Sequence, residues 1–191
     1  MIPAGYLLKR LVPPPEWLVA SPSHIREVCS VSGCVNEDLA DPRETWKHNS
    51  FGLANDPALL WSLAQAAEVD LSRAELLFCT AFEEELESDG WRFDPAQWRP
   101  RTPDPSASIR DDIAWPKEPL QLLGYDVVSG DYGAVHSPLS CNRVAGEIAV
   151  NEHCLLDDFE TAKEAIDAGR FGGGCEPGNY SIFAVYRMER P

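Results

Sequence analysis

The residues best suited to chemistry lie in the stretch His136-Ser-Pro-Leu-Ser-Cys-Asn142 and in the dipeptide His153-Cys154. A cysteine nucleophile needs a base that removes its proton and a polar group that orients the base. Cys141 with His136 or His153 supplies the first two groups, and nearby asparagines supply the third. The spacing matches no cysteine-hydrolase signature, so a hydrogen-bonded turn explains the same residues without catalysis.

Zinc binding is a second chemistry for these residues, with Cys141, His153, Cys154 and Cys175 as ligands. Structural zinc sites normally contain a close pair such as C-x-x-C, and no two cysteines of this chain have that spacing. The adjacent His153 and Cys154 would point to opposite faces of a strand. The three glycines at 172–174 lack the strand and helix of a phosphate-binding loop. We therefore expect neither a metal nor a cofactor.

Acidic residues form a different kind of candidate site, one that binds a partner rather than performing chemistry. The residues that we assign to partner binding are Glu83, Glu84, Glu85, Glu87, Asp89, Trp91, Asp111 and Asp112. Exposed carboxylates attract a basic surface, and tryptophan is a frequent anchor in interfaces. Trp98 and Trp115 are further candidate anchors. The alternative is that the acidic tract only ends a strand with charge, which prevents aggregation through the strand edge.

The net charge of -15 is the most unusual property of the composition. A field of this sign repels phosphate backbones and anionic lipid surfaces, which argues against nucleic-acid and membrane partners. The same field accelerates encounter with a basic protein at low salt. Excess acid also keeps a protein soluble, and this explanation requires no partner.

The subcellular location expected from the sequence is the cytoplasm. Lys9-Arg10 interrupts the apolar run near the N-terminus, so no secretion signal is recognised, and no segment is apolar enough to span a bilayer. Six cysteines are present, and without a signal we expect them to be reduced.

The pattern of elements predicts an α+β fold, in which helices pack on one face of a mixed or antiparallel sheet. The predicted strands span 6–12, 75–82, 120–128 and 180–188. Asp56-Pro57 and Asp157-Asp158 begin the two predicted helices. One domain over 1–191 is expected, with a proline-rich irregular insertion at 94–119. The order of helix and strand occurs twice, although the sequences are too different to be called a repeat.

In size, acidity, tryptophan content and lack of a catalytic signature, the whole chain resembles bacterial toxin-immunity proteins. The segment 124–188, with Ser-Pro-Leu-Ser-Cys-Asn and Glu-Pro-Gly-Asn-Tyr, also resembles small bacterial proteins of unknown role. The first resemblance implies an inhibitor or immunity protein that neutralises a basic toxin or enzyme by occluding its active site. The alternative is a cysteine-dependent hydrolase or transferase that uses Cys141 with His136 or His153. A regulatory interaction module is a third possibility, and a role without catalysis is favoured.

Overall fold

The computed structural model describes residues 1–18, 24–42, 44, 47–82, 112–129, 136–171, 175 and 180–189. Its elements are β1 (Ile2–Arg10), β2 (Glu37–Ala40), α1 (Pro57–Ala66), β3 (Ala74–Ala81), β4 (Leu120–Ser129), α2 (Pro138–Cys141), the 3-10 helix η2 (Val144–Gly146), α3 (Phe159–Asp167) and β5 (Tyr180–Met188). The predicted α+β class is confirmed. The helices are short and few, and most of the predicted insertion at 94–119 lies outside the described residues.

The five strands form one antiparallel sheet in the order β2-β1-β3-β5-β4. β3 and β5 occupy the centre, and their sequences are the near-continuous apolar runs that two covered faces require. β2 was not predicted, because four residues with two acids carry too little pattern. The segment 24–31 contains no helix or strand, only an isolated bridge at Val28.

Both predicted helices begin where their capping residues indicated. The Asp56 carboxylate accepts a hydrogen bond from the Ala58 amide, and Pro57 occupies the first helical turn. The Asp158 carboxylate accepts one from the Thr161 amide in the same way. Within the described part of the chain, no helix is both long and apolar enough to cross a membrane.

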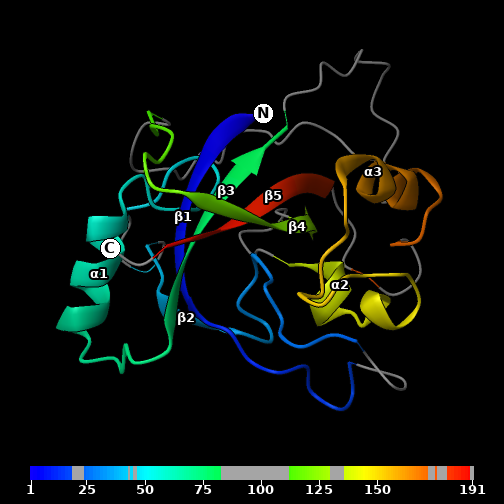
Figure 1. Ribbon diagram of the computed structural model, residues 1–191, viewed down its shortest axis with the longest axis horizontal. Helices are drawn as coiled ribbons and strands as arrows, with labels where there is room; N and C mark the ends of the chain where they lie inside the picture. Colours follow the sequence, from blue (N-terminus) through cyan, green and yellow to red (C-terminus); the bar gives the residue numbers. More distant parts are fainter. Residues whose placement is uncertain are drawn as a thin grey trace.

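Helices α1 and α3 cover opposite ends of the same sheet face (Figure 1). Leu60 and Ala64 of α1 pack on a cluster that includes Leu8 and Phe78. Ala162 and Ile166 of α3 pack on a second cluster that includes Val127, Tyr180 and Ile182. A third cluster, on the other face, contains Leu7, Leu77, Phe183 and Val185 together with loop residues such as Val31, Leu53 and Leu155. The two faces therefore differ: helices cover one, and irregular loops cover the other.

The structure shows an internal repeat, which the sequence indicated only as an order of helix and strand that occurs twice. The unit β1-loop-α1-β3 corresponds to β4-loop-α3-β5, and the two units meet where β3 pairs with β5. In the first loop, the Asn49 side chain accepts hydrogen bonds from the Phe51 and Leu53 amides and donates to the Ala4 carbonyl. In the second loop, the equivalent contacts of Asn151 are to the amides of His153 and Leu155 and to the carbonyl of Leu123.

One glycine in each unit makes this loop arrangement possible. Gly5 and Gly124 adopt φ angles of +132° and +145°, which side chains rarely tolerate. A Cβ atom on Gly5 would lie 2.7 Å from the carbonyl oxygen of Ala54, and one on Gly124 would lie 2.7 Å from that of Leu156. Each loop therefore crosses its strand at a point where only glycine fits, and a β-bulge marks that point in both units.

We expect Gly5→Ala and Gly124→Ala each to lower the free energy of unfolding by about 2 to 4 kcal/mol, because backbone strain and a clash with a carbonyl add. The measurement is urea unfolding followed by circular dichroism. Gly146→Ala is the matched control, since its Cβ would come no closer than 3.4 Å to the Leu18 carbonyl oxygen and its φ is ordinary. Equal, small effects at all three positions would contradict the role assigned to the crossing points.

Candidate functional site

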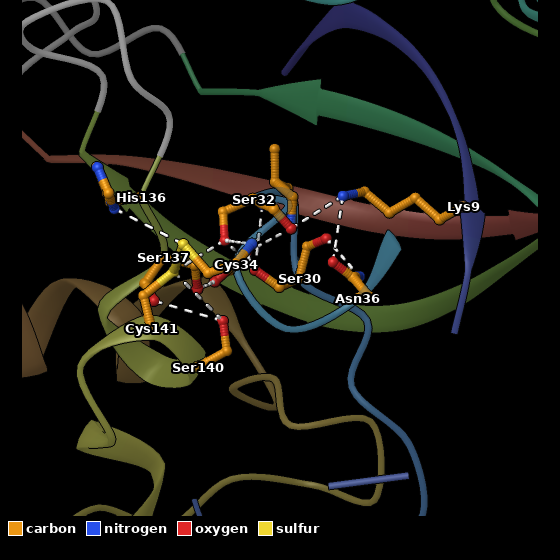
Figure 2. The surroundings of a disulfide bond; sticks show 11 residues. Lys9, Ser30, Ser32, Cys34, Asn36, His136, Ser137, Ser140 and Cys141 are labelled. Atoms are coloured by element: carbon orange, nitrogen blue, oxygen red, sulfur yellow. Dashed lines mark hydrogen bonds between the residues drawn. A yellow bond between two sulfur atoms is a disulfide. The ribbon is translucent and has the colours of Figure 1, made fainter. Parts of the chain in front are cut away.

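A buried polar network lies on the loop-covered face and joins β1 to the segment 30–38. Lys9 is fully buried, and its Nζ lies 2.6 Å from a carboxylate oxygen of Asp38. It donates hydrogen bonds to the Ser32 carbonyl at 2.9 Å and to the Asn36 side-chain oxygen at 3.3 Å (Figure 2). A buried ammonium is tolerated only with such a complete set of acceptors. Lys9 therefore holds this segment on the sheet.

Asp126 of β4 is the second charged group of this network and is fully buried. Its carboxylate accepts hydrogen bonds from the Ser137 hydroxyl at 2.5 Å and from the Val31 amide at 2.8 Å. Burial raises the pKa of Asp126 to about 6, although these hydrogen bonds and the Lys9 charge favour the ionised form. Asp126 thus connects the 30–38 segment to the start of α2.

A disulfide between Cys34 and Cys141 closes the network at the surface, with a Cα–Cα distance of 5.6 Å (Figure 2). Cys34 is exposed and Cys141 half-buried. His136 Nδ1 lies 3.7 Å from the Cys34 sulfur, and the Ser32 hydroxyl lies 3.0 Å from the Cys141 sulfur. The expectation that all cysteines are reduced is wrong for this pair. The two cysteines are separated by 107 residues, so their sequence spacing contained no signal of the pairing.

The structure brings together only part of the predicted catalytic set. Cys141 and His136 lie in one cluster with Cys34. His153 lies in another cluster, where its Nδ1 is 2.8 Å from Glu27 and where Arg187 is 2.6 Å from the same carboxylate oxygen. Because Cys141 is bonded to Cys34, it holds no thiol that could act as a nucleophile in this state.

The cluster around Glu27 stabilises the fold rather than forming a reactive site. Burial opposes ionisation of Glu27, but hydrogen bonds and charges from Arg187 and His153 outweigh it and hold its pKa below the usual value. The adjacent Cys29 thiol is fully buried, and burial raises its pKa. Burial also raises the pKa of Cys154 to about 12. Neither thiol is reactive at neutral pH.

Aromatic side chains cross the helix-bearing face between α1 and α3. We call this set the aromatic strip: Tyr6, Phe78, Phe82, Trp115, Tyr125, Phe159 and Tyr186. Phe78 lies at one end with its ring centre 5.6 Å from that of Trp115 and 6.3 Å from that of Tyr186. Phe82 lies at the other end, stacked on Phe159 at 4.1 Å. The strip therefore consists of two groups of rings on one face, and Tyr6 and Phe78 of the first group are buried.

Several apolar side chains on this face are open to solvent. Trp115 is 48% exposed and Leu122 is 44% exposed. Met1 is 59% exposed, and its sulfur accepts a hydrogen bond from the Thr80 hydroxyl on the same face. Among the described residues only one other large hydrophobic side chain, Trp17, is exposed to this extent. Exposed apolar groups gathered on one face are typical of an interaction surface.

Carboxylates border the aromatic strip at equivalent places in the two units. Burial raises the pKa of Tyr6, and the nearby charges of Glu118 and Asp56 raise it further. Burial also raises the pKa of Tyr125, with smaller contributions from Tyr186 and Asp158. Asp56 and Asp158 are the caps of α1 and α3, and all three carboxylates are exposed. The strip thus combines aromatic rings with negative potential.

Most of the residues that sequence analysis assigned to partner binding lie outside the described residues, namely Glu83, Glu84, Glu85, Glu87, Asp89, Trp91 and Asp111. Asp112 is described; it is exposed and accepts a hydrogen bond from the Asn55 side chain at 3.2 Å. Trp115, one of the candidate anchors, belongs to the aromatic strip. The tyrosines of the strip were missed, and the shared dipeptide Gly-Tyr at 5–6 and 124–125 was the available signal.

No family model, no curated protein and no solved structure matches the chain.

The burial of Lys9 gives a first prediction for this site. Lys9→Met should lower the free energy of unfolding by about 3 to 5 kcal/mol, because Asp38 and two further acceptors lose their cation. The neighbouring Arg10→Met removes a partly exposed ion pair with Glu37 and should cost about 1 kcal/mol or less. Urea unfolding of both variants makes the comparison. Similar costs for both would contradict the central role of Lys9.

Asp126 gives a prediction for pH. Its pKa is higher in the folded chain than the ordinary value of 3.8, so the folded state holds the proton more tightly. Its contribution is therefore present at low pH and is lost as pH rises from 3.8 to about 6. The unfolding free energy of wild type relative to Asp126→Asn should fall by about 3 kcal/mol over this interval. Taking the difference between the two proteins removes the contribution of other carboxylates, such as Glu27, whose pKa folding lowers. A difference in unfolding free energy that does not change with pH would exclude a raised pKa for Asp126.

Proposed function

We propose that this acidic protein binds a basic protein through the aromatic strip and its border of carboxylates. The observation that supports this most directly is Trp115, which is 48% exposed while its ring packs against Phe78 of the aromatic strip. Aromatic faces attract lysine and arginine side chains, and exposed carboxylates pair with them. One surface therefore offers both kinds of contact to the same cationic side chains.

The charge of the whole molecule favours the same class of partner. A net charge of -15 would draw a cationic protein toward the surface from a distance. Trp115, Met1 and Leu122 would then lose their exposure to water, which supplies the apolar part of the binding free energy. Tryptophan and tyrosine at the centre of a contact commonly carry most of that energy.

The biological role that this binding mode favours is that of an inhibitor or immunity protein. An acidic surface with aromatic anchors can fill the cationic cleft of a toxin or enzyme and block access to it. A cysteine-dependent enzyme is less well supported, because Cys141 is disulfide-bonded.

The test begins with capture of partners by the full chain at low salt, followed by purification of the retained protein and titration calorimetry. We expect a basic partner that is released by salt. Trp115→Ala should weaken the purified pair at least about tenfold, through loss of the aromatic anchor. Glu118→Lys should weaken it several-fold and reduce its salt dependence, because a carboxylate at the strip becomes a cation.

Glu147→Lys is the matched control, since it makes the same charge change at an exposed position outside the strip. It should change affinity much less than Glu118→Lys. Equal effects of the two reversals would show that only net charge matters and would contradict a local site. Loss of self-association in Trp115→Ala, with no basic partner retained by wild type, would assign the strip to a second copy of the chain.

A further inference from the structure

The two cysteines of the disulfide and one histidine come from three separate segments, and all three are side chains of the types that ligate metals. Cys34, His136 and Cys141 each offer one ligand atom, and these atoms all lie within 4.8 Å of one another. Cys34 comes from the 30–38 segment, His136 follows β4, and Cys141 ends α2. Two sulfurs and one imidazole nitrogen are the ligand types that Zn²⁺ prefers. These three side chains come together only in the folded chain, which explains why no sequence motif indicates a metal site.

We propose that reduction of the Cys34–Cys141 disulfide creates a zinc site formed by Cys34, Cys141 and His136. In a tetrahedral zinc site, a sulfur and a nitrogen ligand lie about 3.5 Å apart and two sulfurs about 3.8 Å apart. His136 Nδ1 is already 3.7 Å from the Cys34 sulfur. The Cys141 sulfur lies within 4.8 Å of the other two ligand atoms, and breaking the disulfide frees the two sulfurs to separate.

A dithiol is the reductant that opens the Cys34–Cys141 disulfide. The dithiol transfers two electrons and two protons to the disulfide, which becomes two thiols while the reductant becomes a disulfide. Binding of Zn²⁺ then releases the two thiol protons to solvent and leaves two thiolate ligands. The metal and the disulfide are therefore alternatives, and each joins the 30–38 segment to α2.

The surroundings of the three ligands suit a metal with an open fourth position. The Ser32 hydroxyl lies 3.0 Å from the Cys141 sulfur and accepts a hydrogen bond from the Cys34 amide, so it can orient both ligands. Cys34 is exposed, which lets water or a partner side chain complete the coordination.

The other ligand cluster among the described residues, Glu27 with Cys29 and His153, provides a useful contrast. Arg187 already places a cation 2.6 Å from the Glu27 carboxylate, and the Cys29 thiol is fully buried with a raised pKa. A metal there would have to displace a guanidinium and ionise a buried thiol. Cys154 and Cys175, which sequence analysis considered as ligands, belong to neither cluster.

The test uses the full chain, reduced with dithiothreitol and freed of reductant by anaerobic gel filtration. Titration with Co²⁺ should give the thiolate-to-metal absorption and visible bands of tetrahedral cobalt, and these should saturate at one equivalent. Zn²⁺ should displace Co²⁺, and competition with a chromogenic chelator should give its affinity. The oxidised protein, titrated in the same way, should show no such bands.

Variants identify the ligands. His136→Ala, which keeps both cysteines and can still form the disulfide, should bind Zn²⁺ at least about tenfold more weakly. The double variant Cys34→Ser/Cys141→Ser should lose the thiolate absorption, whereas Cys175→Ser should retain it. Circular dichroism checks that each variant is folded. Absence of the bands in reduced wild type, equal binding by His136→Ala, or full absorption in the double variant would each overturn the proposal, which does not depend on the proposed function.

Discussion

The fold depends on one arrangement that occurs twice, a loop closed by an asparagine and pressed against a strand glycine. Asn49 and Asn151 each satisfy two loop amides and a strand carbonyl, so backbone groups that the β-bulge would leave unpaired are bonded. The same loops lead directly into the capping residues of α1 and α3. Because the two loops are equivalent, the two helices begin on the same face of the sheet.

This placement creates the surface to which we assign binding. Each loop pairs with the residue after its strand glycine, Tyr6 or Tyr125, and ends at a capping carboxylate close to that tyrosine. The helices lie at the two ends of the sheet (Figure 1). The rings of the aromatic strip belong to or pack against the two clusters that these helices cover. On the other face the units differ: one contributes Lys9 and the other Asp126, and a disulfide joins their loops. The two units are therefore alike on the face that the helices cover, and they differ on the face that the loops cover.

Local patterns predicted the elements, while contacts between distant segments remained out of reach. Asp56 and Asp158 marked both helix starts, because capping is a short-range interaction. The Cys34–Cys141 pair could not be predicted, since it depends on how two distant loops meet. The repeat was seen only as an echo, because its shared residues are few and widely spaced among different side chains. Charge led us to expect a basic partner, and only the fold collects Tyr6, Tyr125 and Trp115 on one face.

Chemical footprinting of carboxylates tests the central claim most directly. The protein, alone and in its complex, is labelled with a carbodiimide and an amine, and each site is quantified by mass spectrometry. Our account predicts that the complex protects Glu118, Asp56 and Asp158 while Glu147 and Glu37 react as in the free protein, because only the first three border the aromatic strip. Protection of Glu147 or Glu37 with continued labelling of Glu118, Asp56 and Asp158 would contradict it and would place the partner elsewhere on the molecule.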